Sequence, residues 1–281
     1  MKIFQQKENL IAEIEMFRGQ AKTIGFVPTM GSLHKGHLSL IKLAGKECDI
    51  VICSIFINPT QFNDPKDYKL YPKHEESDTK MLIDANCDVL YLPKVDDIYP
   101  NGVEKLVYPL NQLGAVLEGK YRPGHFDGVI EVVKRLFDIV NADRAYFGMK
   151  DFQQLAVIRW ITEHFKLPVK IIGGPIIRNN NGLALSSRNE RLSDSQFKSA
   201  LKLSKSLFYI RDNFRNSSFQ TLYSTALSEL EKDSNINIEY FELANAHTLQ
   251  PVSNFDEAQS VGVFLAAKIG EVRLIDNIIL F

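Results

Sequence analysis

The stretch "VPTMGSLHKGHLSL", Val27 to Leu40, decides the fold of this chain. An apolar, strand-like run breaks at Pro28, a turn with two glycines and two histidines follows, and a helical apolar pattern resumes at Leu38. A helix N-terminus offers backbone N–H groups and about half a positive charge to an anion, and glycine lets the backbone approach it closely. The stretch therefore predicts a strand, a turn that faces a ligand, and a helix.

Short apolar runs alternate with longer helical patterns up to about residue 176. The strand-like runs are rich in Val, Ile, Tyr or Phe and end at turn residues: Thr23 to Val27, Asp49 to Ile57, Asp88 to Leu92, Arg144 to Phe147 and Val169 to Ile172. Helical candidates lie between them: Leu38 to Ala44, Glu75 to Ala85, Val129 to Val140 and Phe152 to Phe165. This alternation predicts an α/β fold, a Rossmann-like parallel sheet with helices on both faces.

The pattern changes after "IIGGPIIR", which ends at Arg178. "SDSQ", Ser193 to Gln196, fits a capping box that opens a long helix. A second helix is expected around Phe219 to Lys232, and strands are expected near Ile238 to Leu243, Val261 to Lys268 and Val272 to Leu280. We therefore predict two domains, a Rossmann-like domain over residues 1–176 and a smaller C-terminal α+β domain over residues 177–281.

Composition and charge argue against several classes of function. The 281 residues can bury a large core, and 33 Lys plus Arg nearly cancel 34 Asp plus Glu, so we expect neither nucleic acid nor a membrane as a partner. Cys48, Cys53 and Cys87 form no CxxC pair, which favours free, mostly buried thiols in a reducing compartment. "MKIFQQKENL" turns polar after Phe4, and apolar runs such as Ile50 to Ile57 fall far short of the roughly 18 residues of a membrane span. We expect a soluble, cytoplasmic protein.

Three polar motifs directly follow strands of the predicted sheet. They are "PTMGSLHKGH" after the first strand, "NPTQF" (Asn58 to Phe62) after the second and "GMKDFQQ" (Gly148 to Gln154) after the fourth. In parallel sheets ligands bind beyond the carboxyl ends of the strands, where the loops share one crevice. We therefore expect the chemistry to gather at this edge of the sheet.

His34 and His37 of the first motif lie three residues apart, so they project to the same side of a helix start. One alternative is a metal site, but that needs a third ligand, and the sequence has neither an HExxH motif nor a cysteine cluster. Another is ordinary polar helix surface. Phosphate recognition fits better, because Gly31 and Gly36 permit close approach of the backbone and the imidazoles add donors.

The other polar motifs are each open to a plainer interpretation. The amides of Asn58 and Gln61 suit a small substrate with hydroxyls and a carboxylate, or they simply mark a turn. Lys150 and Asp151 form either a solvated ion pair or, through Lys150, a contact to phosphate. In "LSSR", Leu185 to Arg188, the serines either cap the turn or join the arginine in binding phosphate.

Given its place after a strand and at a helix start, "MGSLHKGH" resembles the HxGH signature of the class I aminoacyl-tRNA synthetase and nucleotidyltransferase superfamily. The remaining motifs narrow the resemblance to the pantothenate synthetase (pantoate–β-alanine ligase) family. They follow one another in order: "PTMGSLHKGH", "SIFINPTQF", "YP" at Tyr71 and Pro72, "EGKYRPGHFDGV" from Glu118 to Val129, "YFGMKDFQQL", and "GLALSSRN" from Gly182 to Asn189. The sequence departs from the family pattern at Met149, where Glu is usual, and at Asn181, where Asp is common. It also has Lys73 and His74 after Pro72, where an Arg-Thr pair is often seen.

The resemblance implies an ATP-dependent ligase that condenses (R)-pantoate with β-alanine through a pantoyl-adenylate, giving pantothenate, AMP and diphosphate. It implies ATP as a substrate together with Mg²⁺, the small-molecule substrates pantoate and β-alanine, and a homodimer formed through the N-terminal domain. The first domain would bind the nucleotide and carry the catalytic groups. The second domain would act as a lid.

The resemblance also assigns roles to single residues. Catalytic roles fall to His34, His37 and Lys150. ATP binding is implied for Met30, Gly31, Ser32, Leu33, His34, Lys35, Gly36, His37, Gly148, Met149, Lys150, Asp151, Ile177, Leu185, Ser186, Ser187 and Arg188. Pantoate binding is implied for Gln61, Gln154, Asn58 and Arg122, and β-alanine binding for Gln61.

Four residues of these motifs and of their surroundings have their own expectations. Asp78 is a candidate to hold magnesium through ATP, but as an exposed helix residue it would instead be solvated. Arg122 and His125 lie in "YRPGHF", a loop whose Pro123 and Gly124 oppose regular helix. Gln153, the neighbour of Gln154, is expected to point elsewhere on its helix and to be structural.

Overall fold

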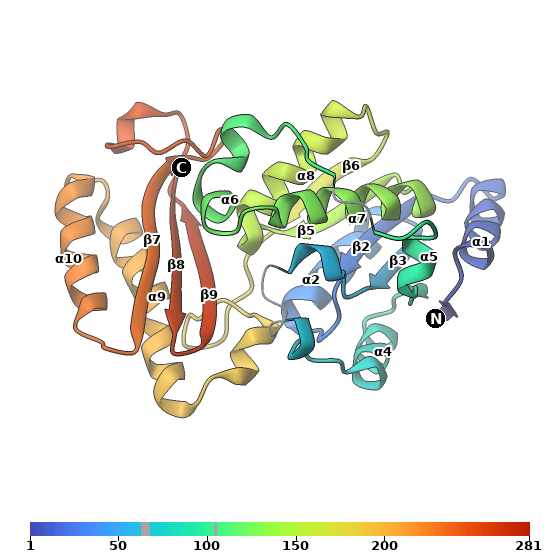
Figure 1. Cartoon of the computed structure of the whole chain (residues 1–281), viewed down its shortest axis with the longest axis horizontal. Coiled ribbons are helices and arrows are strands. Elements are labelled where there is room, and N and C mark those ends of the chain that lie inside the picture. Colours follow the sequence, from blue (N-terminus) through green and yellow to red (C-terminus); the bar gives the residue numbers. More distant parts are fainter. Residues whose placement is uncertain (63–67, 104–105) are drawn as a thin grey trace. The chain divides into compact units, whose positions relative to one another are not determined.

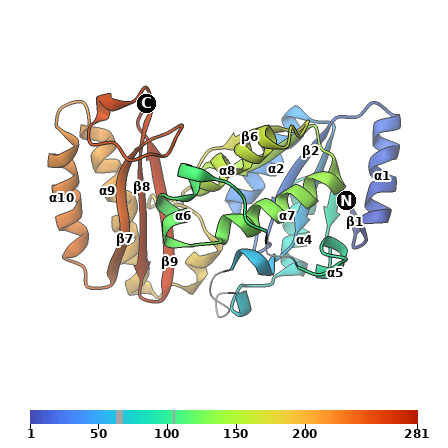
Figure 2. The same cartoon turned by 45° about the horizontal axis from the view of Figure 1, so that its top comes forward.

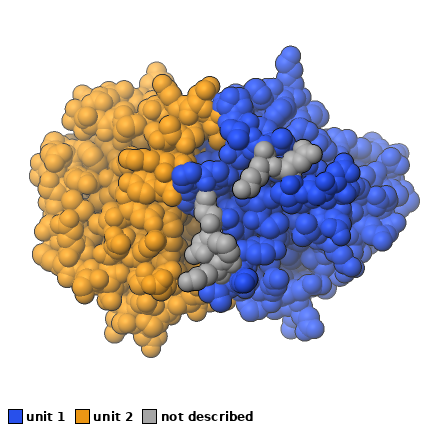
Figure 3. Space-filling view, viewed as in Figure 1, with its two compact units in different colours: residues 1–109, 122–149, 154–175 blue, residues 110–121, 150–153, 176–281 orange. Residues whose placement is uncertain are grey.

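The computed structural model describes residues 1–62, 68–103 and 106–281. The chain forms two compact units, shown in blue and orange in Figure 3. The first unit comprises residues 1–109, 122–149 and 154–175, and the second comprises residues 110–121, 150–153 and 176–281. Two short segments of the N-terminal part of the sequence thus belong to the second unit. The domain boundary predicted between residues 176 and 177 stays a prediction.

The first unit is built on a parallel sheet in the order β1-β4-β3-β2-β5-β6 (Figure 1). Its strands are β1 (Lys2–Phe4), β2 (Ile24–Thr29), β3 (Ile50–Ile55), β4 (Val89–Tyr91), β5 (Arg144–Gly148) and β6 (Lys170–Gly174). All five strands expected from the sequence are present, and the predicted fold class is confirmed. The edge strand β1 is an addition to that prediction, because three residues are too few to show an alternating pattern.

Helices cover both faces of this sheet (Figure 2). The helices of the first part of the chain are α1 (Lys7–Gly19), α2 (Lys35–Glu47), α4 (Glu75–Asp84), α5 (Val95–Ile98), α7 (His125–Val140) and α8 (Phe152–His164). Leu40 and Ala44 of α2 and Leu82 of α4 pack in one buried cluster with side chains of β2, β3 and β4. On the opposite face, Phe137 of α7 meets Phe26 and Phe147 edge-on, with ring centroids 6.4 and 6.3 Å apart.

Helix α7 begins at His125, four residues earlier than the Val129 predicted from its apolar pattern. Gly124 stands at the N-cap with a left-handed backbone (φ +79°), a conformation that glycine adopts without steric cost. The expectation that His125 lies in an irregular loop is therefore wrong. His125 is the first residue of α7 and is buried.

The second unit is a three-stranded antiparallel sheet with helices α9 and α10 packed together on one face (Figure 1, Figure 2). Its elements are α6 (Leu117–Tyr121), α9 (Asp194–Asn213), α10 (Phe219–Glu231), β7 (Ile236–Asn245), β8 (Val261–Ile269) and β9 (Val272–Ile279). The predicted capping box is present: Gln196 N–H donates to Ser193 Oγ at 3.3 Å, and Ser193 N–H donates to Gln196 Oε1 at 3.0 Å. The smaller α+β part is thus confirmed.

All three cysteines are free thiols, and Cys53 and Cys87 are buried. Burial raises the pKa of Cys87 to about 12, so this thiol stays protonated at neutral pH. In the part of the chain that the structure describes, every helix is too short or too polar to cross a lipid bilayer.

Candidate active site

The turn between β2 and α2 combines two left-handed residues with a capped helix start. Gly31 has φ +79° and Ser32 has φ +50°, and α2 begins three residues later at Lys35. A left-handed backbone is costly for a residue with a Cβ atom, so Ser32 must be held in place by its surroundings. The predicted strand, turn and helix are therefore present, with Met30 to His37 at the carboxyl end of β2.

Both imidazoles of the turn use Nδ1 to accept a backbone hydrogen bond. Gly36 N–H donates to His34 Nδ1 at 3.1 Å, and His34 N–H donates to His37 Nδ1 at 3.3 Å. His34 thereby caps α2, and the two ring centroids lie 4.1 Å apart. Because Nδ1 is the acceptor in each neutral ring, the proton sits on Nε2, where it can be donated to an anion.

Gly36 is required by the position of the His34 ring. A Cβ atom at residue 36 would lie 2.8 Å from Cε1 and 2.9 Å from Nδ1 of His34, which is closer than real contacts allow. The backbone of Gly36 is not left-handed, so the need is for space. This glycine permits the histidine cap.

Asp78 of α4 is buried and accepts hydrogen bonds from two backbone amides of the turn. Its Oδ2 accepts from Ser32 N–H at 2.7 Å, and its Oδ1 accepts from Leu33 N–H at 2.8 Å. The expectation of an exposed, solvated side chain is wrong, because the helix turns this residue toward the sheet. The magnesium contact of Asp78 stays a prediction, and both of its oxygens are already engaged with backbone amides.

Asn58 and Gln61, which follow β3, lie together in a buried polar cluster at the 3₁₀ turn Pro59–Gln61. Asn58 Nδ2 donates to the Gly128 carbonyl at 3.0 Å and to Gln61 Oε1 at 3.3 Å, and Asn58 Oδ1 accepts from Tyr99 Oη at 2.8 Å. Burial raises the pKa of Tyr99 to about 12, so its hydroxyl remains a donor. Asn58 is thus engaged within the protein, and its amide orients the side chain of Gln61.

The buried His125 supports the same turn, because its Nδ1–H donates to the Gln61 carbonyl at 2.7 Å. Gln61 Nε2 in turn contacts Met30 Sδ at 2.7 Å, which joins the turns after β2 and β3. Arg122 and Gln154, both partly exposed, belong to the first unit as well. A direct contact of either to a substrate stays a prediction.

The remaining predicted residues belong mostly to the second unit. Lys150 Nζ lies 3.6 Å from Asp151 Oδ1, with 18 % of the lysine side chain and 48 % of the aspartate side chain exposed. The ion pair weighed from the sequence is therefore present, but it is loose and half-exposed, so it contributes little stability. Gln153 is structural, as expected: its Nε2 donates to the carbonyls of Leu113 and Val116 at 2.8 and 2.9 Å.

The segment from Ile177 to Arg188 forms a compact turn that leads into a short 3₁₀ helix (Ser187–Arg191). Leu185 N–H donates to the Ile177 carbonyl at 2.9 Å, and Ser186 Oγ accepts from Arg188 N–H at 3.3 Å. The turn-capping alternative is therefore realised for Ser186, while Ser187 is buried. Binding of phosphate by Ser187 and Arg188 stays a prediction.

The described residues form no metal centre from protein side chains alone. Among the described residues, nowhere do three His, Cys, Asp or Glu side chains come together in a way that could hold a metal ion. The donor set around the turn, two imidazoles and the N-terminus of α2, suits an anion better than a cation. These residues fit Mg²⁺ only as an ion that arrives with the phosphates of a nucleotide.

Sequence reasoning missed four residues that organise these sites. Tyr99 and Gly128 hold Asn58, while Arg178 and Asp276 form an ion pair in the second unit. Their partners lie 41, 70 and 98 positions away in the chain, so no local pattern could reveal them. The "LIDN" run around Asp276 gave one signal, a carboxylate next to an amide in an otherwise apolar strand.

Comparison with known proteins places this geometry in a family. The family model described as pantoate-beta-alanine ligase matches residues 2–279. The pantothenate synthetases of Porphyromonas gingivalis and Christiangramia forsetii are 42 % and 40 % identical to this chain, over 99 % and 100 % of it and 99 % of each relative. The crystal structure of pantothenate synthetase from Thermus thermophilus matches with a TM-score of 0.94 and 37 % identity over the whole of both chains. The structure of pantoate-beta-alanine ligase from Francisella tularensis, complexed with beta-gamma ATP and beta-alanine, matches with a TM-score of 0.83 and 37 % identity over 100 % of this chain and 98 % of the other. This chain therefore belongs to the pantoate–β-alanine ligase family.

Proposed function

We propose that the chain catalyses the ATP-dependent, AMP-forming condensation of pantoate with β-alanine. In the first step the pantoate carboxylate attacks the α-phosphorus of ATP, which gives pantoyl-adenylate and releases diphosphate. In the second step the amine of β-alanine attacks the mixed anhydride, the amide bond forms, and AMP leaves. The full-length family match carries this proposal.

The turn from Met30 to His37 is the proposed site for the phosphates. Its support is chemical: two Nε2–H donors and the start of α2 suit an oxyanion. Ser32 Oγ is buried and has no hydrogen-bond partner among the described residues, as expected where a ligand completes the site. Donors fixed before the reaction stabilise the charge that develops on the phosphoryl oxygens.

Lys150, Ser187 and Arg188 are also proposed to bind ATP, together with Gly148, Met149, Asp151 and Ile177. An ammonium and a guanidinium would offset charge on the α-phosphoryl group and on the leaving diphosphate. The Lys150 side chain is 18 % exposed, and its pair with Asp151 is loose at 3.6 Å. ATP brings Mg²⁺ with it, and that ion would supply further charge compensation.

Gln61 is the proposed contact for pantoate and then for β-alanine. Its side chain is held by Asn58 and Met30, and its carbonyl by His125, so it offers a fixed amide rather than a mobile one. We propose Asn58 as the support of Gln61 and keep Gln154 and Arg122 as pantoate contacts on the strength of the family pattern.

A homodimer and a cytoplasmic location are also proposed on the strength of the resemblance. Light scattering coupled to size exclusion would test the dimer, which predicts about twice the chain mass of 31.9 kDa. A chain-length mass at every concentration would contradict it.

The test of the activity is an omission assay. The purified chain is supplied with ATP, Mg²⁺, pantoate and β-alanine, and AMP release is measured after each component is left out in turn. AMP should accumulate only in the complete mixture, while exchange of labelled diphosphate into ATP should need pantoate but not β-alanine. Exchange without pantoate would instead indicate a nucleotidyltransferase with another acceptor.

A further inference from the structure

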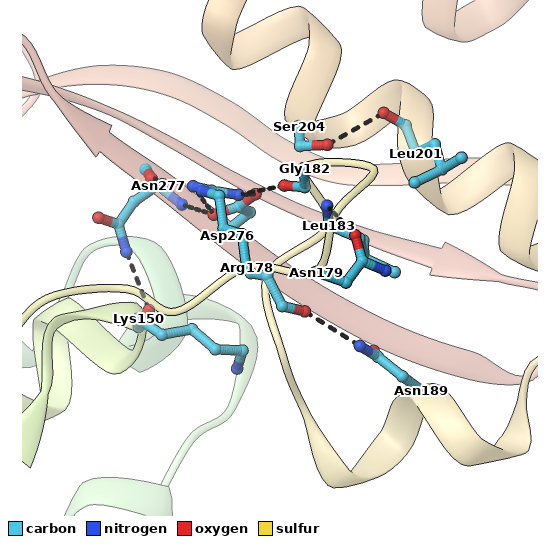
Figure 4. A network of polar contacts seen from close by, with 11 residues as sticks. Lys150, Arg178, Asn179, Gly182, Leu183, Asn189, Leu201, Ser204, Asp276 and Asn277 are labelled. Atoms are coloured by element: carbon cyan, nitrogen blue, oxygen red, sulfur yellow. Dashed lines mark hydrogen bonds and ion pairs between the residues drawn. The ribbon is translucent and has the colours of Figure 1, made fainter. Parts of the chain in front are cut away.

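Lys150, and Arg178 in the turn that leads to the second proposed ATP-binding segment, are hydrogen-bonded to two adjacent residues of β9. The backbone carbonyl of Lys150 accepts from Asn277 Nδ2 at 2.9 Å. The carboxylate of the neighbouring Asp276 accepts a hydrogen bond from each terminal nitrogen of Arg178, at 2.6 and 2.8 Å. Figure 4 shows these contacts, with Arg178 pointing at the strand from the turn that leads to the LSSR segment, Leu185 to Arg188.

Arg178 also fixes the turn to which it belongs. Its guanidinium donates to the Gly182 carbonyl at 3.0 Å and to the Asn277 carbonyl at 3.2 Å, and it lies 5.0 Å from the ring centre of Phe208 in α9. All three partners lie in different elements. The planar guanidinium of an arginine can donate to several acceptors at once and stack on a ring, whereas the single ammonium of a lysine cannot.

Backbone hydrogen bonds connect Arg178 to the LSSR segment. Arg178 and Ala184 form an antiparallel bridge, and Leu185 N–H donates to the Ile177 carbonyl at 2.9 Å. Asn189 Nδ2 donates to the Ala184 carbonyl at 3.0 Å on the other side of Ser186 and Ser187. A shift of Arg178 would therefore displace the serines and the arginine that follow.

The burial of Arg178, Asp276 and Asn277 argues that these residues hold other groups in position. Asp276 and Asn277 are 4 % and 3 % exposed, and 17 % of the Arg178 side chain is exposed. Buried ion pairs lose about as much in desolvation as they gain in attraction, so apolar side chains of similar volume would serve stability as well. What apolar side chains could not do is hold Lys150 and the LSSR segment at fixed distances from one strand.

We infer that Arg178, Asp276 and Asn277 are positioning residues for adenylate formation. They hold Lys150 and the Leu185–Arg188 segment in the arrangement that receives the phosphates of ATP, and they act through these segments. This inference rests on the proposed function, because it assumes that these two segments bind ATP. It adds three residues of which two, Asp276 and Asn277, lie about 90 positions beyond the LSSR segment in the sequence.

The test compares the two half-reactions in near-isosteric variants. Asn277→Asp replaces the donor to the Lys150 carbonyl with an oxygen, and Asp276→Asn removes the bidentate acceptor of Arg178. We expect each to lower pantoate-dependent exchange of diphosphate into ATP by about 10- to 100-fold, because misplacement of about 1 Å costs that much. Conversion of supplied pantoyl-adenylate and β-alanine into pantothenate should change by less than about 3-fold, because that step needs no diphosphate contacts.

Asp233→Asn is the matched control within the second unit. Asp233 pairs with Lys202 at 2.8 Å, and that ion pair lowers the pKa of Asp233 to about 2. Its hydrogen-bonding partners lie in α9 and the turn before β7, away from Lys150 and the LSSR segment. This variant should lose stability and keep the exchange rate. Arg178→Lys, which keeps the charge but not the fork, should fall between Asp276→Asn and the unmodified chain in exchange activity.

Thermal unfolding of every variant separates misfolding from misplacement. If Asn277→Asp does not fold, Asn277→Ser takes its place, since it removes the same donor with less bulk. Equal losses in both half-reactions, or full exchange activity in folded Asp276→Asn and Asn277→Asp, would overturn the inference. Absence of exchange in the unmodified chain would overturn the proposed function itself, and the inference with it.

Discussion

Asp78 and Leu33 lie 45 positions apart in the sequence, yet the carboxylate of one accepts the backbone N–H of the other at 2.8 Å. The second oxygen of Asp78 accepts from Ser32, whose left-handed backbone (φ +50°) needs such support. A buried carboxylate on α4 therefore sets the conformation of a turn on the neighbouring β2–α2 unit. The position of the two histidines depends on it.

Replacement of Asp78 should damage both stability and activity. Asp78→Ala leaves two buried amides without an acceptor and should lower the free energy of unfolding by about 1–3 kcal/mol for each. Asp78→Asn keeps one acceptor and should cost less. Asp84→Asn, at the exposed end of the same helix, is the control and should change neither urea unfolding nor exchange activity. A stable, fully active Asp78→Ala would show that the turn holds itself.

Gly36→Ala should separate activity from stability. A methyl group at residue 36 would lie 2.8 Å from the His34 ring and push it from its cap, so we expect adenylate formation to fall by about 10²-fold. Alanine within a helix stabilises the fold by about 0.5–1 kcal/mol relative to glycine. This gain offsets part of the stability lost with the histidine cap, so the change in thermal unfolding should be small. Gly45→Ala in the same helix meets only Val51 at 3.7 Å and should raise stability without changing the rate. Equal rates in the two variants would contradict the steric argument.

His37→Gln tests whether His37 donates a proton or only a hydrogen bond. Glutamine keeps a distal N–H donor but cannot titrate near neutral pH. We expect a loss of about 10-fold in kcat and a basic limb of the pH–rate profile that matches the unmodified chain, because diphosphate bound to magnesium can leave without a proton. Disappearance of that limb, with a rate that no longer depends on pH, would favour the proton donor.

The sequence was informative wherever local pattern and tertiary contacts agree. Five strands and the placement of the Met30–His37 turn followed from apolar runs, glycines and the rule that ligands bind beyond strand ends. Asp78 could not be placed in the same way. A weakly amphipathic helix such as α4 gives little indication of which face is buried, and the amides that Asp78 accepts from belong to a distant segment.

The start of α7 differs from its prediction for another reason. Pro123 and Gly124 indicate a break in helix, but a left-handed glycine is also a good residue to precede a helix, and the apolar pattern alone cannot distinguish the two. The sequence pattern therefore predicts a loop at His125, although His125 is buried and donates to the Gln61 carbonyl at 2.7 Å. Contacts of this kind depend on the packing of α7 against the turn after β3, which no short motif encodes.

Lys150→Ala tests the electrostatic part of the proposed mechanism. Removal of one preorganised charge at the phosphates should lower single-turnover adenylate formation by at least about 10²-fold. Stability should hardly change, because the 3.6 Å pair with Asp151 is half-exposed. Lys205→Ala, exposed on α9, is the charge-matched control and should retain the full rate. Lys150→Arg keeps the charge but alters its shape, so recovery of most of the rate would indicate that charge alone suffices, and near-normal adenylation by Lys150→Ala would refute the assignment.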